Sequence, residues 1–147
     1  MTGPLIFLTT SAEETQKAGR EIAVLLKPGD VVCLTGELGA GKTTLIKGIA
    51  EKLGGINPLE VTSPTFTYLH TYPGSPPLHH FDLYRLASSE QFLSLGFTEF
   101  FGAGGICCIE WPEKIPQELS FSKVCIDLTY LSAQERNITF QRFYDKK

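Results

Sequence analysis

A glycine-rich segment that ends in lysine and threonine constrains this 147-residue chain more than any other feature. The segment, Gly36-x4-Gly41-Lys42-Thr43, satisfies the full pattern of a phosphate-binding loop, or P-loop. It follows an apolar run at residues 31–35 and precedes apolar residues at helical spacing that stop at a Gly-Gly pair. A strand, a glycine-rich loop and a helix in this order predict an α/β fold that binds a phosphorylated ligand.

Each position of the loop has a chemical reason. Glycines allow backbone N–H groups to turn inward around a phosphate, and the helix that starts near Lys42 adds the positive end of its dipole. Lys42 would bridge the β- and γ-phosphates, and the Thr43 hydroxyl is a hard oxygen ligand suited to Mg²⁺. A simple strand-to-helix turn has no need of a Lys-Thr pair, so we predict a site for a nucleotide and Mg²⁺.

A P-loop site also needs a carboxylate to hold the metal, and the candidates are Asp82, Glu110 and Asp127. Residues 106–109 are continuously apolar, which predicts a central strand beside the P-loop strand, with Glu110 at its end and within reach of Thr43. Asp82 lies in a segment where polar and apolar residues alternate. We expect its strand outside the central sheet, with Asp82 acting on the γ-phosphate side. We expect Asp127 to be a solvated charge on an edge strand.

Three further features each have two interpretations. The segment Ser63-Pro-Thr65 could be a switch whose threonine hydroxyl reaches Mg²⁺ or the γ-phosphate, or it could be the rigid start of a hairpin. His80 and Asp82 lie at positions i and i+2 on one strand face, which suits a metal pair or a structural hydrogen bond. Trp111 could stack on a base or a partner, or it could pack in the interior.

The rest of the chain completes an α/β sheet. Ser11 and Glu14 form a capping box that starts a helix, and short helices interrupted at Gly96 are expected within residues 88–101. Further strands are expected at residues 5–9, 65–72, 78–84, 123–129 and 137–143. We therefore predict a single P-loop NTPase-like domain over residues 1–147. Its mixed sheet has central parallel strands, an antiparallel hairpin and antiparallel C-terminal strands, and helices flank it.

Composition restricts the partners and the compartment. The chain has 13 Lys and Arg against 16 Asp and Glu, a net charge of −3, and so lacks the basic footprint of a protein that holds nucleic acid by itself. Its four cysteines form no Cys-x-x-Cys pair and suit buried thiols in a reducing compartment. No apolar run approaches the ~18 residues of a membrane helix, and no signal peptide is visible. We expect a cytoplasmic protein with no membrane partner.

The nucleotide and the class of protein follow by exclusion. GTPases recognise guanine with an Asn-Lys-x-Asp motif, and the only asparagines here, Asn57 and Asn137, precede proline and isoleucine, which favours ATP. Small-molecule kinases stabilise the transferred phosphoryl group with several arginines, and this chain has four scattered ones. Three hypotheses remain: an ATPase whose hydrolysis serves a partner, a stand-alone kinase, and an adaptor that binds ATP without hydrolysing it.

Five segments carry a resemblance to a known family. They are residues 36–44 (GELGAGKTT), 63–67 (SPTFT), 80–86 (HFDLYRL), 96–97 (GF) and 109–112 (IEWP). In order and spacing they resemble the TsaE (YjeE) family, and the resemblance spans about residues 11–136. It implies a bacterial P-loop ATPase required for the threonylcarbamoyl modification of adenosine 37 in tRNAs that read codons beginning with A (ANN codons).

The resemblance also implies partners and site residues. The partners are TsaD, the transferase, and its paralogue TsaB; tRNA is bound through the complex, and ATP hydrolysis resets the complex without transferring the carbamoyl group. Thr43 and Glu110 are implied as Mg²⁺ ligands, and Lys42, Thr65, Asp82 and Glu110 as catalytic groups. The implied ATP-binding residues are Thr10 and Ser11 near the adenine, then Gly36, Leu38, Gly39, Ala40, Gly41, Lys42, Thr43, Thr44, Trp111 and Arg136.

Overall fold

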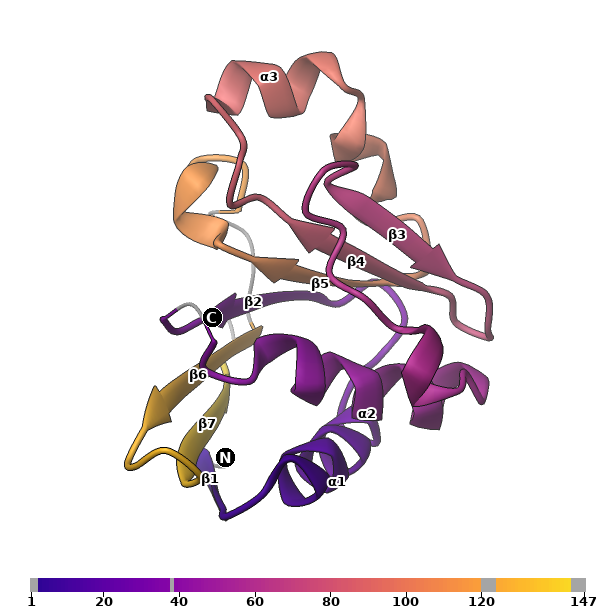
Figure 1. Ribbon diagram of the computed structural model, residues 1–147. Helices are drawn as coiled ribbons and strands as arrows, with labels where there is room; N and C mark the ends of the chain where they lie inside the picture. The colour runs from indigo at the N-terminus through magenta and orange to yellow at the C-terminus, as the bar shows by residue number, and fades with distance from the viewer. Residues whose placement is uncertain (1–2, 38, 120–123, 144–147) are drawn as a thin grey trace.

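The structure is a computed structural model, and it describes residues 3–37, 39–119 and 124–143. The strands in these residues are β1 (Leu5–Thr9), β2 (Val31–Thr35), β3 (Leu69–Tyr72), β4 (Leu78–Asp82), β5 (Ile106–Glu110), β6 (Val124–Tyr130) and β7 (Arg136–Arg142). The α-helices are α1 (Ala12–Ala23), α2 (Lys42–Gly54) and α3 (Ser89–Ser94), and the 3-10 helices are η1 (Pro58–Glu60), η2 (Phe97–Phe100) and η3 (Pro112–Lys114). The strands form one sheet in the order β1-β7-β6-β2-β5-β4-β3 (Figure 1).

The centre of the sheet is parallel and its two margins are antiparallel. β2 pairs in parallel with β6 on one side and β5 on the other, and β5 pairs in parallel with β4. The antiparallel pairs are β3 with β4, β6 with β7, and β1 with β7. The predicted mixed sheet, with its central parallel strands, its hairpin and its antiparallel C-terminal strands, is therefore confirmed.

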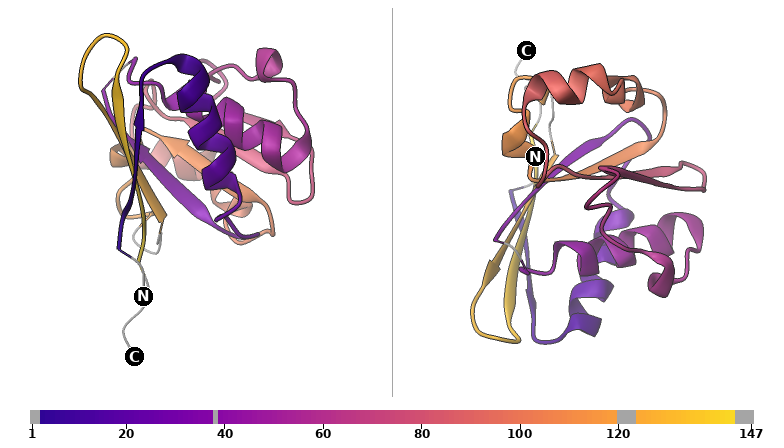
Figure 2. Two further views of the ribbon diagram at one scale, coloured as in Figure 1. Left: turned by 90° about the horizontal axis from the view of Figure 1, so that it is seen from below. Right: turned by 45° about the horizontal axis from the view of Figure 1, so that its top comes forward.

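Helices cover both faces of the sheet, and each face has its own apolar core. α1 and α2 lie against one face, where Ile22 and Ile49 pack with Val32 of β2. α3 lies over the other face, where Phe81 of β4 meets Phe92 with ring centroids 5.9 Å apart (Figures 1 and 2). Parallel strands covered on both faces are buried throughout, which accounts for the continuous apolar runs of β2 and β5. No helix in the described ranges is long and apolar enough to cross a membrane.

α1 and α2 cross in close contact because two glycines lie where they meet. A Cβ atom on Gly19 would lie 2.1 Å from the Leu45 carbonyl oxygen, and one on Gly48 would lie 1.9 Å from the Gln16 carbonyl oxygen. Both distances are far shorter than van der Waals contact, so only glycine permits this spacing. The contact fixes the position of α2, whose first residue is Lys42 of the P-loop.

The strand that contains Asp82 lies inside the sheet, so the prediction that placed it outside the central sheet is wrong. β4 pairs with β5, and all five of its residues are buried. Its polar side chains are buried because each meets a partner from elsewhere in the chain. His79 meets the Thr71 hydroxyl at 2.9 Å, and His80 meets the Glu110 carboxylate at 2.5 Å. Alternation indicates a half-exposed strand only where the polar side chains reach water, and here they are hydrogen-bonded instead.

The prediction of an edge strand for Asp127 is also wrong, because β6 lies between β7 and β2. Within the described residues the edge strands are β1 and β3. The Asp127 side chain is nevertheless exposed, and it accepts a hydrogen bond from the Thr35 hydroxyl at 2.7 Å. β1, from the other end of the chain, pairs with β7, and this long-range pairing leaves no trace in the local pattern of β6.

The predicted hairpin is present, but its first strand is shorter than the expected 65–72. β3 begins at Leu69 because Tyr68 has a left-handed φ of 67° and donates its N–H to the Pro64 carbonyl at 2.8 Å. Beyond the hairpin, Gly96 separates two short helices, α3 and η2, as predicted.

The start of α1 follows the predicted capping residue, with one difference. The Ser11 hydroxyl accepts a hydrogen bond from the Glu14 N–H at 3.1 Å, as expected of an N-cap. The Glu14 carboxylate does not close the capping box on Ser11; it accepts from the N–H of Thr10 at 2.7 Å and from the Thr10 hydroxyl at 2.9 Å. Thr10 is thereby tied to the entrance of the helix.

Candidate functional site

The P-loop connects β2 to α2 through glycines in conformations that other residues rarely adopt. Gly36 has a φ of 144°, and Gly41, the N-cap of α2, has a φ of 102°. A Cβ atom on Gly36 would lie 2.6 Å from the Leu128 carbonyl oxygen, so the loop passes close to β6. Leu38, which the resemblance places in the phosphate cradle, lies outside the described residues.

Lys42 is buried at the base of the loop with only 4 % of its surface exposed. Its Nζ donates a hydrogen bond to the Gly36 carbonyl at 2.7 Å and lies 3.9 Å from the centroid of the Trp111 ring. Burial lowers the pKa of the Lys42 ammonium, and the negative charge of Glu110 opposes that shift. A buried cation with acidic neighbours is thus held at the place where a P-loop binds phosphate.

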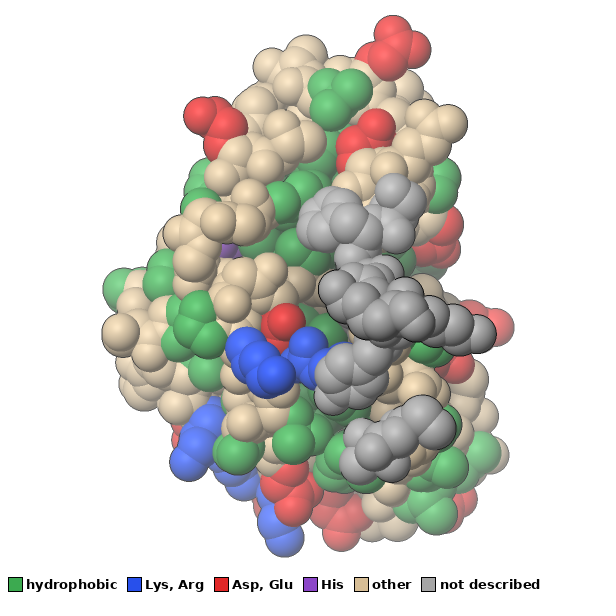
Figure 3. Space-filling model, turned by 180° about the vertical axis from the view of Figure 1, so that it is seen from behind, with side chains coloured by type: hydrophobic (Ala, Val, Ile, Leu, Met, Phe, Trp, Pro, Cys, Tyr) green, Lys and Arg blue, Asp and Glu red, His purple; other side chains and the backbone are tan. Residues whose placement is uncertain are grey.

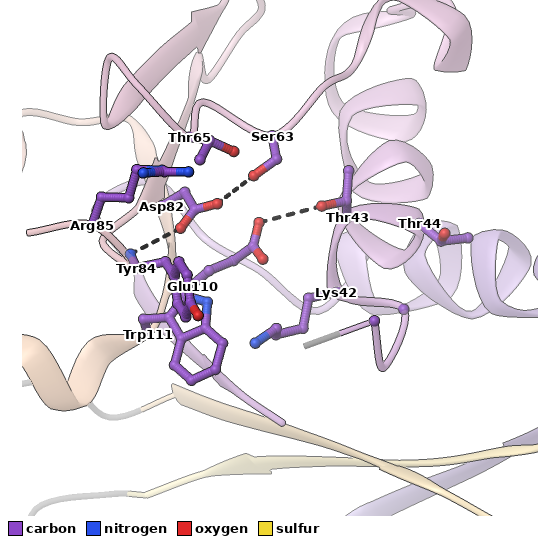
Figure 4. Close-up of a pocket in the computed structure, with 12 residues that line it drawn as sticks. Lys42, Thr43, Thr44, Ser63, Thr65, Asp82, Tyr84, Arg85, Glu110 and Trp111 are labelled. Carbon is purple, nitrogen blue, oxygen red and sulfur yellow. Dashed lines mark hydrogen bonds between the residues drawn. The ribbon is translucent and has the colours of Figure 1, made fainter. Parts of the chain in front are cut away.

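Glu110 ends β5 and faces the first turn of α2. Its Oε2 accepts a hydrogen bond from the Thr43 hydroxyl at 3.5 Å (Figure 4). The same oxygen lies 2.5 Å from His80 Nε2. The predicted position of Glu110, at the end of a central strand beside the P-loop strand, is confirmed. Of the two interpretations of His80, the structure shows the hydrogen bond. No group of three or more His, Cys, Asp or Glu side chains suited to a metal occurs in the part of the chain that the structure describes.

Asp82 ends the neighbouring strand and is the register partner of Glu110. Its Oδ2 accepts a hydrogen bond from the Ser63 hydroxyl, and its Oδ1 accepts one from the Tyr84 N–H at 3.0 Å. Thr65 lies beside Ser63 on the same side of the carboxylate (Figure 4). Ser63 therefore reaches the Asp82 carboxylate, and Thr65 lines the same pocket, while the segment also precedes the hairpin. The switch role of the Thr65 hydroxyl stays a prediction.

These groups line one pocket of about 400 Å³ at the carboxyl ends of the parallel strands, where open α/β sheets bind ligands (Figure 4). The pocket contains two carboxylates, Asp82 and Glu110, and two cationic side chains, Lys42 and Arg85. The complete lining is Gly39, Gly41, Lys42, Thr43, Thr44, Ser63, Thr65, Asp82, Tyr84, Arg85, Glu110 and Trp111.

A second pocket, of about 150 Å³, shares Gly39, Gly41 and Thr44 with the first. Its other lining residues come from the start of α1 and from the segment before β7: Ser11, Ala12, Thr15, Ala133, Gln134 and Arg136. Arg136 is fixed there, because its Nε donates to the Ala40 carbonyl at 3.0 Å and its guanidinium lies 4.4 Å from the centroid of the Tyr130 ring. The two pockets are adjacent, so a ligand whose phosphates lie in the larger pocket could extend into the smaller one.

The structure brings most of the expected site residues together. Gly39, Gly41, Lys42, Thr43, Thr44, Thr65, Asp82, Glu110 and Trp111 line the larger pocket, and Ser11 and Arg136 line the smaller one. Gly36 and Ala40 contribute carbonyl groups that hold Lys42 and Arg136. Thr10 lies outside both linings. Asp127 lies in a separate depression beside Gly36, away from Thr43.

Sequence reasoning missed two lining residues, Tyr84 and Arg85, and the role of a third, Ser63. The first two follow Asp82 directly in the HFDLYRL segment, so their position in that motif was the available signal. The Tyr84 ring lies 5.0 Å from the Trp111 ring, and the Arg85 guanidinium lies 4.8 Å from the ring of Phe66. Trp111 thus forms part of the wall of the pocket and also packs against the apolar core on the α3 side of the sheet.

The oxygen donors of the pocket fit Mg²⁺ better than a transition metal. Thr43 and Glu110 present a hydroxyl and a carboxylate to each other, and Asp82 adds a second carboxylate nearby. Mg²⁺ prefers oxygen ligands and is commonly bound by one or two protein groups together with water and phosphate oxygens. Water molecules and the phosphate oxygens of a bound ligand would complete the coordination of such a site.

The chain is similar in sequence and in fold to proteins of one family. A family model described as threonylcarbamoyl adenosine biosynthesis protein TsaE matches residues 9–138. A protein named tRNA threonylcarbamoyladenosine biosynthesis protein TsaE from Treponema pallidum is 44% identical over 132 residues, which are 90% of this chain and 96% of that protein. One of the same name from Bacillus subtilis is 42% identical over 133 residues, 90% of this chain and 82% of its own length. The crystal structure of Bacillus subtilis YdiB matches with a TM-score of 0.77 and 37% identity, covering 97% of this chain and 87% of that one.

Proposed function

Because the chain belongs to the family of the threonylcarbamoyl adenosine biosynthesis protein TsaE, we propose that it binds and hydrolyses ATP in the threonylcarbamoyl modification of tRNA. The observation that carries the proposal is one pocket in which Lys42 and Thr43 of the P-loop meet the carboxylates of Asp82 and Glu110. A lysine for phosphate, a hydroxyl and a carboxylate for Mg²⁺, and a further carboxylate for water are the parts that phosphoryl chemistry needs.

Phosphate binding is assigned to the P-loop. Its backbone N–H groups and the positive end of α2 favour phosphate oxygens. The Lys42 ammonium, which donates to the Gly36 carbonyl in the structure, would turn to the β- and γ-phosphates. The nucleoside would extend over Gly39, Gly41 and Thr44 into the smaller pocket, toward Ser11 and Arg136. Thr10 lies outside the lining of that pocket, next to Ser11, and its contact with the nucleoside stays a prediction.

Thr43 and Glu110 are the proposed Mg²⁺ ligands, directly or through the water shell of the ion. When bound, Mg²⁺ neutralises charge on the phosphate oxygens. Asp82 is the proposed base that orients the attacking water and accepts its proton, because Ser63 and the Tyr84 N–H fix its carboxylate in the wall of the pocket. Thr65 is proposed as the switch hydroxyl on the γ-phosphate side.

We propose that the partners hold the tRNA. On the face shown in Figure 3, the basic side chains of the described residues form small groups with acidic side chains beside them, without a continuous basic surface. The net charge of −3 supports the same division of labour. The proposed partners are TsaD and TsaB, and the proposed substrate of the complex is adenosine 37 of tRNAs that read ANN codons. We propose that the complex acts in the cytoplasm and that ATP hydrolysis resets it between turnovers.

The isolated protein tests the nucleotide part of this proposal. We expect calorimetry with excess Mg²⁺ to show tighter binding of ATP than of GTP, and the Lys42→Ala variant to lose that binding. Incubation with ATP and a mixture of metabolites should yield only ADP and phosphate by mass spectrometry. A phosphorylated metabolite would instead identify a kinase, and unchanged ATP in the presence of TsaD, TsaB and tRNA would identify an adaptor that binds without hydrolysis.

A further inference from the structure

His80 is a fully buried histidine that the proposed chemistry leaves without a role. It lies in the middle of β4, on the sheet face that α2 covers, with 0% of its surface exposed. Its Nε2 lies 2.5 Å from Glu110 Oε2. Its Nδ1 is buried and has no hydrogen-bond partner among the described residues. A polar side chain at this depth requires a structural or functional reason, because an unpaired buried polar atom is costly.

The environment of the ring determines which nitrogen carries the proton. A buried N–H group without an acceptor is rarer in proteins than a buried acceptor without a donor. A proton on Nδ1 would be such an unpaired N–H, whereas a proton on Nε2 points at the Glu110 carboxylate. The geometry therefore places a proton on Nε2, and His80 donates a hydrogen bond from Nε2 to Glu110 Oε2.

We propose that His80 is a positioning residue that holds the Glu110 carboxylate toward Thr43. This inference rests on the proposed function, because it gives the Glu110 orientation a purpose in binding Mg²⁺. The same oxygen, Oε2, accepts a hydrogen bond from His80 Nε2 at 2.5 Å and one from the Thr43 hydroxyl at 3.5 Å. Because the bond to His80 is much the shorter, it fixes the position of the carboxylate and thereby keeps Oε2 within reach of Thr43. A flexible glutamate without this donor would have to be ordered by the metal itself.

Three substitutions separate this role from a packing role. The His80→Gln variant keeps an N–H donor at nearly the same distance from the backbone as His80 Nε2. The His80→Leu variant keeps a side chain of similar volume and removes the donor. The matched control is His79→Gln: His79 is the adjacent residue on the opposite face, where it meets the Thr71 hydroxyl at 2.9 Å and lies 4.7 Å from the Phe100 ring. Nucleotide binding is measured by calorimetry with the full chain, once in EDTA and once across a Mg²⁺ titration.

We expect His80→Leu to bind ATP in EDTA as the wild type does, because the P-loop is untouched, and to need about 10-fold or more Mg²⁺ for half-maximal enhancement of binding. His80→Gln should restore the Mg²⁺ requirement to within about 3-fold of wild type, a range that a modest change in one hydrogen bond covers. His79→Gln should show no Mg²⁺ effect. In a Glu110→Gln background, His80→Leu should add no further loss, because the carboxylate that it positions is gone.

The positioning role is overturned if His80→Leu and His80→Gln show the same Mg²⁺ requirement, whether both equal the wild type or both are impaired. If His80→Leu fails to fold, His80→Asn replaces it: its amide is one bond shorter than that of Gln and cannot reach Glu110, so an Asn variant as good as Gln would also overturn the role. A wild-type protein whose ATP binding does not respond to Mg²⁺ would refute the proposed function itself, an outcome that is distinct because it appears before any variant is compared.

Discussion

Trp111 has a backbone φ of 60°, a left-handed conformation that is uncommon for a residue other than glycine. Such a conformation persists only where its surroundings fix it, and it is often found at functional sites. Here Pro112 begins η3 directly after it, and the indole lies against Lys42 and Tyr84. β5 ends at Glu110, and the turn at the next residue, Trp111, places an aromatic ring beside the Lys42 ammonium.

The metal assignment predicts opposite results for two conservative substitutions. Glu110→Gln removes the charge that faces Thr43, so the Mg²⁺-dependent part of ATP affinity should fall by about 10-fold or more. Asp127→Asn, on an exposed side chain that accepts from Thr35, should leave it unchanged. Calorimetry at several Mg²⁺ concentrations measures both. A loss with Asp127→Asn and none with Glu110→Gln would contradict the assignment.

Asp82 should affect hydrolysis more than binding. Asp82→Asn keeps the shape of the side chain and one of its two hydrogen-bond acceptors but removes the base, so ATP turnover in the presence of TsaD and TsaB should fall by about 100-fold or more while ATP affinity stays within about 3-fold. Ser63→Ala removes one of the two hydrogen-bond donors to Asp82 and leaves the carboxylate in place, so it should give a smaller loss in turnover. Turnover is followed as phosphate release and affinity by calorimetry. Equal losses of affinity and turnover in Asp82→Asn would indicate a binding role instead.

At the scale of elements, the contact between α1 and α2 sets the position of the P-loop helix. Gly48→Ala would place a Cβ atom 1.9 Å from the Gln16 carbonyl oxygen, and the helices would have to separate. We expect the free energy of unfolding to fall by about 1–3 kcal/mol and ATP affinity to weaken as α2 shifts. Gly3→Ala is the control, because nothing lies within 4 Å of a Cβ at that position. Thermal and urea denaturation measure the difference, and equal stability of the two variants would contradict the packing argument.

The neighbouring strands β2 and β6 bring two thiols into register, Cys33 and Cys125. A hydrogen bond from Cys33 lowers the pKa of Cys125 to about 7, whereas burial raises the pKa of Cys107 to about 12. The thiolate is the reactive form, so the rate of alkylation of Cys125 should rise between pH 6 and pH 8 while Cys107 stays unlabelled in the folded protein. Peptide mapping after iodoacetamide treatment checks this, and Cys107 labelled as fast as Cys125 would contradict it.

Elements were predictable where the local pattern alone decides the structure. The apolar run at 106–109 is sufficient to place Glu110 beside the P-loop strand, because a strand buried on both faces must be central. β4 could not be predicted in the same way: His79, His80 and Asp82 are polar, and their partners come from β3, β5 and the segment at Ser63. Burial of such a strand depends on hydrogen bonds between distant residues, which a local pattern does not contain.

At the scale of the whole molecule, the order of the strands and the second pocket depended on long-range contacts. β1 pairs with β7, and the smaller pocket joins Ser11 to Arg136 across nearly the whole chain. Neither association follows from composition or spacing; the resemblance to the family supplied Ser11 and Arg136 as site residues, and the structure shows that they share a pocket. The interpretation of residues 1–147 as a single domain stays a prediction.

We propose that ATP hydrolysis in this pocket depends on the partner proteins. Its most direct test is ATP turnover with and without TsaD and TsaB. We expect slow phosphate release by the protein alone and a marked increase when both partners are added. Lys42→Ala should lose that increase and should yield no threonylcarbamoyladenosine in a reconstituted tRNA assay. Equal turnover with and without the partners, or full tRNA modification with Lys42→Ala, would contradict it.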